Sequence, residues 1–62
     1  RLLTHYRRRA GLSITQLAAL AGIARTAVHK LENGERRPSF DTACRLADAL
    51  GISVQKLREK KG

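Results

Sequence analysis

Apolar residues recur along the chain at helical spacing, in short segments that glycines or a proline separate. Glycines stand at positions 11, 22, 34, 51 and 62, and the single proline is Pro38. Apolar residues at i, i+3, i+4 and i+7 predict an amphipathic helix, and a glycine directly after them is typical of a helix end. The pattern therefore predicts an all-α chain of several short helices joined by tight turns.

The second and third predicted helices are the most clearly delimited. Ser13 is the expected N-cap of the second helix, and Gln16, three residues later, completes a capping box. Gly22 ends this helix, and the third follows at once, from about Arg25 to Glu32. Two helices joined by only three or four residues must cross steeply, as in a helix-turn-helix.

Three further helices are predicted around this pair. The first runs from about Leu2 to Ala10, the fourth begins after the N-cap Ser39, and a short fifth begins after Ser53. The residues expected on the inner faces are, in chain order, Leu3, Tyr6, Ala10, Leu17, Ala18, Ala21, Val28, Leu31, Phe40, Ala43, Leu46, Ala47, Leu50, Val54 and Leu57. We expect the chain end at Lys60 and Lys61 to fray.

The charge balance indicates that this helical domain binds a polyanion. The 62 residues carry 13 Lys and Arg against 5 Asp and Glu, a net charge of +8. Aromatic residues make up only 3% of the chain, which disfavours a base-stacking platform for single strands.

The remaining composition excludes several other classes of protein. The single cysteine, Cys44, cannot form an intrachain disulfide, and we expect it to be buried or half-buried. No apolar run is long enough to cross a bilayer. Two His and five acids spread over short helices form no catalytic or metal-binding set, so we expect no enzyme, no metal and no cofactor. The expectation is one compact cytoplasmic domain over residues 1–62.

The residues at the helix boundaries and turns form a longer pattern. They are Leu3, Arg7 and Gly11-Leu12-Ser13, then Leu17-Ala18 and Ala21-Gly22-Ile23, then Val28 and Leu31-Glu32-Asn33-Gly34, then Pro38-Ser39, Leu46-Ala47, Ala49-Leu50-Gly51-Ile52-Ser53 and Leu57. With this pattern the chain from Leu3 to Leu57 resembles the lambda-repressor/Cro-type helix-turn-helix domain, the XRE family of bacterial and phage regulators. The resemblance implies a compact five-helix fold whose helix-turn-helix proper covers about residues 14–33.

The resemblance also implies which residues meet DNA. The third helix of the family enters the major groove, where side chains read base edges. The positions that match its base-contacting residues are Arg25, Thr26, His29 and Lys30. The positions expected to contact phosphate are Ser13, Gln16, Asn33, Arg36 and Arg37.

A structural ion pair and two departures from the family pattern follow from the same comparison. Arg7 and Glu32 match a pair that we expect to fix the third helix against the first. Many relatives have Gln where this chain has Ile14, and an isoleucine cannot supply the side-chain half of a phosphate clamp. Many also cap the third helix with Ser or Thr, whereas this chain has Ala24 followed by Arg25.

The expected function is a sequence-specific regulator of transcription, with a repressor preferred, that binds duplex DNA as a homodimer on a palindromic operator. Its dimer surface is either the fifth helix, with Val54 and Leu57, or lies in a further segment. A DNA-binding antitoxin and a restriction–modification controller stay open, since these differ in neighbouring genes rather than in sequence. A protein-interaction module is less favoured, because Arg25 and Lys30 charge the face that it would use. A partner or effector domain outside this chain also stays open.

Overall fold

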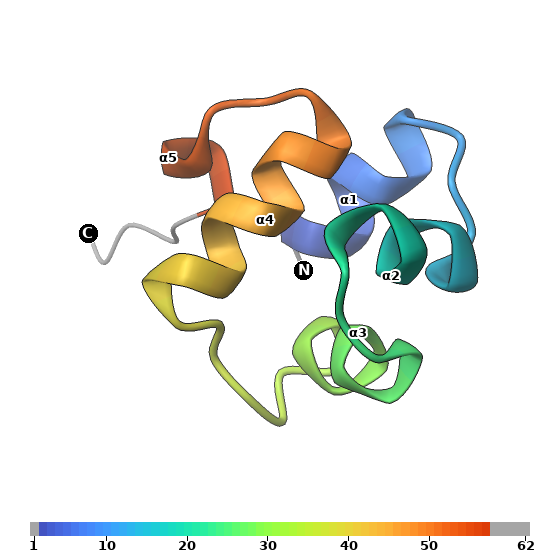
Figure 1. The fold of residues 1–62 in the computed structure, drawn as a ribbon, viewed down its shortest axis with the longest axis vertical. Helices are drawn as coiled ribbons and strands as arrows, with labels where there is room; N and C mark the ends of the chain where they lie inside the picture. Colours follow the sequence, from blue (N-terminus) through green and yellow to red (C-terminus); the bar gives the residue numbers. More distant parts are fainter. Residues whose placement is uncertain (1, 58–62) are drawn as a thin grey trace.

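The computed structural model describes residues 2–57, which form five helices and no strand (Figure 1). The helices are α1 (Leu2–Arg9), α2 (Ile14–Ala21), α3 (Arg25–Glu32), α4 (Phe40–Leu50) and α5 (Val54–Leu57). The all-α five-helix prediction is therefore confirmed over this range. The fraying that we expect at Lys60 and Lys61 lies outside the described residues.

The predicted capping signals delimit the helices as expected. The hydroxyl of Ser13 accepts a hydrogen bond from the backbone N–H of Gln16 at 3.0 Å, and the side-chain carbonyl of Gln16 accepts from the N–H of Ser13 at 2.8 Å. This reciprocal pair satisfies two of the four donors that a helix start leaves unpaired. At the other end of α2, Gly22 has φ +72°, a left-handed conformation that favours glycine.

The hydrophobic core lies where the helix-turn-helix meets the fourth helix. Leu17 of α2, Val28 of α3 and Leu46 of α4 are the largest fully buried side chains among the described residues. Burial of one such side chain contributes about 1.5–3 kcal/mol. Figure 1 shows α4 crossing the middle of the molecule, with α5 on one side and α2 on the other. Residues of α2 pack against α3 and α4, so one core holds the two helices of the helix-turn-helix in place.

Two side chains expected on inner faces are exposed instead. Phe40 is 67% exposed, although its spacing from Ala43 and Ala47 puts it on the same side of α4. It is the first residue of that helix, and because helical side chains tilt toward the N-terminus, its ring extends past the end of the core. Ala10 is exposed because α1 ends at Arg9, one residue earlier than expected.

Candidate nucleic-acid interface

The connection between α2 and α3 is a tight turn of three residues, Gly22 to Ala24. The carbonyl of Ala18 accepts hydrogen bonds from the N–H groups of Gly22 at 2.9 Å and Ile23 at 3.1 Å. Ile23 is half-buried and packs against the core. The left-handed glycine redirects the chain, and the isoleucine anchors the turn, so α3 leaves α2 at a fixed angle.

The recognition helix α3 has one anchored face and one free face. Val28 is fully buried and Glu32 is 9% exposed, so these two residues hold the helix against the rest of the domain. The opposite face is solvent-exposed in the isolated chain. Its residues are the four that the sequence predicts at base edges, Arg25, Thr26, His29 and Lys30. The structure thus brings these four side chains together on a single exposed helix face.

The N-terminus of α3 lacks a side-chain cap. Ala24 has the extended conformation of an N-cap, with φ −68° and ψ 146°, but no side chain accepts a hydrogen bond from the first turn. No acidic residue lies in that turn, and Arg25 adds a positive charge to the positive end of the helix dipole. An anion placed here would accept hydrogen bonds from the backbone N–H groups and would offset the positive charge of Arg25 and of the helix dipole. This helix end is therefore suitable for a DNA phosphate.

Arg7 and Glu32 form a bidentate ion pair between α1 and the end of α3. The Nε and Nη2 atoms of Arg7 donate to Oε2 and Oε1 of Glu32 at 2.5 Å and 3.2 Å. The Nη1 atom of the same guanidinium donates to the backbone carbonyl of Leu12 at 2.9 Å. Arg7 therefore joins the recognition helix to the loop that precedes α2, a third contact that sequence spacing did not predict.

The start of α2 offers a second helix N-terminus for a phosphate group. In the capping box, the side chains of Ser13 and Gln16 each accept a hydrogen bond from the backbone N–H of the other residue. The N–H groups of Ile14 and Thr15 are then the remaining donors of the first turn. The Gln16 side chain is exposed and keeps its amide nitrogen as a donor. Ile14 is half-buried and packs against the core instead of reaching outward, so it contributes packing here.

Asn33, at the end of α3, lies within a small polar cluster. Its amide nitrogen is 3.2 Å from Nδ1 of His29 and 3.4 Å from a carboxylate oxygen of Glu35. The backbone N–H of Asn33 donates to the carbonyl of His29 at 3.0 Å. Sequence reasoning assigned no role to Glu35, and its only signal is an acidic side chain two residues after Asn33.

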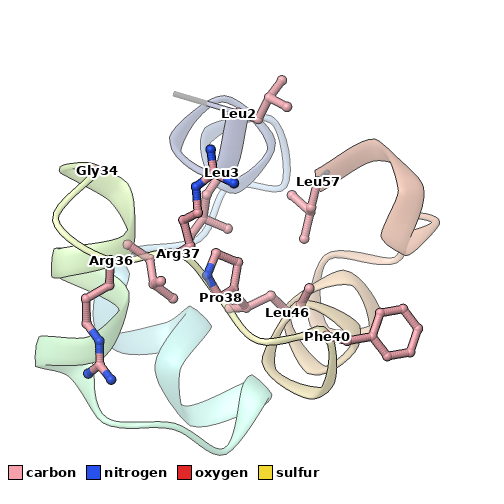
Figure 2. Close-up of a pocket in the computed structure, with 11 residues that line it drawn as sticks. Leu2, Leu3, Gly34, Arg36, Arg37, Pro38, Phe40, Leu46 and Leu57 are labelled. Carbon is pink, nitrogen blue, oxygen red and sulfur yellow. The ribbon is translucent and has the colours of Figure 1, made fainter. Parts of the chain in front are cut away.

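The loop between α3 and α4 carries the two arginines expected at phosphates, and both are exposed. Figure 2 shows that they point in different directions: Arg37 extends toward α1, whereas Arg36 points away from the pocket on the α3 side. The pocket that these residues line has a volume of about 550 Å³, and the rest of its lining includes the apolar side chains of Leu2, Leu31 and Leu57. Figure 2 therefore places the Arg36 side chain on the α3 side of the loop and the Arg37 side chain on the α1 side.

Arg45 of α4 lies over the turn of the helix-turn-helix, which sequence reasoning did not predict. Its Nη1 atom is 3.7 Å from the position that a Cβ atom on Gly22 would occupy. Its Nε atom is 3.2 Å from a carboxylate oxygen of Asp41, an exposed i,i+4 pair. His5 is exposed and stacks edge-to-face on Tyr6, and Cys44 is half-buried as expected.

Residues 2–57 contain no group of three His, Cys, Asp or Glu side chains that could hold a metal ion. None of the five helices has the length and apolar character needed to cross a bilayer.

Comparison with known proteins agrees with this geometry. A sequence model of the family described as Helix-turn-helix matches residues 3–57. The control protein C.SmaI of Serratia marcescens is 40% identical over 57 residues, which cover 92% of this chain and 68% of that protein. The crystal structure of the restriction-modification controller protein C.AhdI from Aeromonas hydrophila superposes with a TM-score of 0.87 at 38% identity, covering 90% of this chain and 85% of that one. The chain therefore belongs to the Cro/C1-type helix-turn-helix family of DNA-binding transcriptional regulators.

Proposed function

We propose that this chain regulates transcription by binding a specific duplex DNA site with α3 in the major groove. The observation that carries the proposal is the division of α3 into two faces. Val28 and Glu32 anchor the inner face, while the outer face presents four exposed polar or cationic side chains at the spacing of one helix face. A helix held in this way can enter the groove while its inner face stays packed against the core.

The surroundings of α3 support the phosphate contacts that fix a protein on the duplex. The N-termini of α2 and α3 present backbone N–H groups, and the loop after α3 supplies Arg36, whose side chain lies on the α3 side of that loop. A protein-interaction surface would favour apolar or neutral side chains at these positions. The cationic side chains of Arg25 and Lys30 instead favour a polyanionic partner.

We further propose that the regulated genes belong to a restriction–modification system. Two relatives that cover most of this chain are a control protein and a restriction-modification controller, at 40% and 38% identity. The sequence alone favoured a repressor and left a controller and an antitoxin open. The relatives shift the preference to a controller, and neither of them is described as an enzyme.

We propose that the chain binds DNA as a homodimer on a palindromic site. The exposed ring of Phe40 and the partly apolar pocket that it lines give a second copy a surface to cover. Leu57 of α5 lines the same pocket, which supports the expectation that α5 belongs to the dimer surface. Half-sites would then be about 34–36 Å apart, one turn of DNA, and the two-fold symmetry of the dimer predicts a palindromic operator.

Selection of binding sites from a pool of random duplexes tests these proposals together. The expected result is a single enriched palindrome that also occurs upstream of neighbouring restriction and methyltransferase genes. Recovery of a palindrome elsewhere in the genome would support the DNA-binding regulator and contradict the restriction–modification role. Failure to enrich any sequence would contradict the regulator itself.

A further inference from the structure

Asn33 and Glu35 together fix which atoms of the Asn33 amide face His29. A carboxylate only accepts hydrogen bonds, so the Glu35 oxygen at 3.4 Å requires the nitrogen of the amide, rather than its oxygen, on that side. The same nitrogen is 3.2 Å from Nδ1 of His29. The amide nitrogen carries two hydrogens, and this arrangement directs one to each neighbour.

The contact determines where His29 carries its proton. Because the Asn33 amide nitrogen can only donate, Nδ1 of His29 must accept. A neutral imidazole has one donor and one acceptor nitrogen, and the partner of one nitrogen sets the role of the other. The hydrogen of the neutral His29 ring is therefore on Nε2, the nitrogen that Asn33 does not contact.

We propose that Asn33 is a positioning residue for base reading. It holds His29 in the Nε2–H form, so that His29 donates to an acceptor on a base edge, namely N7 or O6 of guanine, N7 of adenine or O4 of thymine. The N4 amino group of cytosine, a donor, is disfavoured at the same place. This inference rests on the proposed binding of α3 in the major groove, and it adds a specific chemical preference at one base position.

The arrangement also separates this role from the phosphate contact expected of Asn33. Both amide hydrogens are directed at His29 and Glu35, which leaves the side-chain oxygen of Asn33 as the remaining polar atom. That oxygen accepts hydrogen bonds, as phosphate oxygens do, so it cannot donate to DNA phosphate. A phosphate contact through this amide would require the contact with His29 to break, and the two roles therefore predict different mutant behaviour.

Nitrogen NMR of the two histidine rings in the free protein tests the positioning directly. At a pH where both rings are neutral, we expect His29 in the Nε2–H form. Asn33→Asp places a carboxylate against Nδ1, and because a carboxylate accepts, the proton is expected to move to Nδ1. His5 is the internal reference, since it pairs with Tyr6 on α1 and its ring should not change. Glu35→Asp is the matched control, because its carboxylate, like that of Glu35, can only accept from Asn33.

The DNA half of the test compares base preferences of the same variants. Asn33→Asp adds negative charge and weakens binding to every duplex, so the informative quantity is the ratio of affinities between duplexes that differ at one base pair. We expect that ratio to change by about two- to tenfold, the range for one hydrogen bond, in favour of a base that presents a donor. Glu35→Asp, which keeps an acceptor-only side chain beside Asn33, should leave the ratio unchanged.

Three results would overturn the inference. An Nδ1–H form of His29 in the wild-type chain contradicts the tautomer, and an unchanged ring in Asn33→Asp contradicts the control by Asn33. Unaltered affinity ratios in Asn33→Asp, with uniform loss on all duplexes, would make Asn33 a phosphate contact only. If the wild-type chain prefers no duplex, the proposed function fails and base reading falls with it, whereas the NMR result still decides the role of Asn33.

Discussion

The guanidinium of Arg7 donates hydrogen bonds to the carboxylate of Glu32, 25 residues away in sequence, and to the backbone carbonyl of Leu12. The side chains of Arg7 and Glu32 are only 13% and 8% exposed. One side chain thus connects α1, the loop before α2 and the end of the recognition helix. This connection fixes the position of α3 relative to the loop that leads into α2.

Glu32→Gln is expected to destabilise the domain severely. Removing one partner of a buried ion pair costs about 3–5 kcal/mol, because the other charge is left without compensation. Small domains have little stability to lose, so urea unfolding should show most of the chain unfolded at low denaturant. Asp41→Asn, which breaks an exposed i,i+4 pair, is the control and should cost about 0.3–0.5 kcal/mol. Equal effects of the two substitutions would show that the Arg7–Glu32 pair is not buried in solution.

Replacing both partners should restore much of the loss. Arg7→Met combined with Glu32→Leu removes both charges together, and apolar substitutes for a buried pair are often neutral or stabilising. The backbone carbonyl of Leu12 would lose its partner, so we expect the double variant to recover folding only in part. Urea unfolding of the two single variants and the double variant measures this, and a double variant as unstable as the singles would contradict the account.

Ala24→Ser should stabilise α3, because position 24 already has the backbone conformation of an N-cap and lacks only the oxygen. The expected gain is about 0.5–2 kcal/mol, measured as a shift in the urea midpoint. Ser13→Ala is the matched opposite, and it should lose a similar amount through the broken capping box of α2. A destabilising Ala24→Ser would mean that the start of α3 is not held in the conformation described.

Substitutions of Gly22 should separate strain from lack of space. A Cβ atom at this position meets only the flexible end of Arg45, at 3.7 Å, so alanine fits. Its left-handed φ of +72° nevertheless costs an alanine about 1–2 kcal/mol, whereas asparagine adopts this conformation more readily. Thermal unfolding should therefore rank glycine above asparagine and asparagine above alanine. An alanine variant as stable as the wild type would contradict the left-handed turn.

Phe40→Ser tests whether the exposed ring belongs to a dimer surface. Because the ring is 67% exposed in the isolated chain, the monomer should lose little stability, within about 0.5 kcal/mol. Sedimentation at increasing protein concentration should then show a weaker dimer than the wild type. Leu46→Ala is the contrast, since this side chain is 1% exposed and its truncation should cost about 2–5 kcal/mol. Unaltered association of Phe40→Ser would exclude the ring from the interface.

Local signals in the sequence predicted the helix boundaries because each depends on neighbouring residues alone. The capping box of Ser13 and Gln16 and the left-handed Gly22 are examples. Periodicity placed Phe40 on an inner face, but it does not show where the core ends, and the ring lies past that end. The hydrogen bond from Arg7 to Leu12 depends on a side-chain conformation that spacing does not set.

The site could be predicted only as a set of residue types on one helix face. The exposure of Arg25 and His29 follows from the period of α3, and the structure agrees. The different directions of Arg36 and Arg37 do not follow from sequence, because the two residues are adjacent in a loop without a regular period. The cluster of Asn33 with its two neighbours was likewise hidden, since it arises from side-chain conformations at a helix end.

Sequence-specific binding of duplex DNA is the central claim, and a salt titration with matched duplexes tests it most directly. Affinities for the selected site and for a scrambled duplex would be measured between about 50 and 200 mM salt. Over that range, a protein that makes about six to ten phosphate contacts loses roughly 10³–10⁵-fold in affinity. We predict a steep loss on both duplexes, with the selected site always the tighter. Arg36→Ala should reduce the slope of log affinity against log salt by about one on both duplexes. Arg25→Ala should instead reduce the ratio of affinities between the selected and the scrambled duplex. A flat salt response, or equal affinity for both duplexes, would contradict the account.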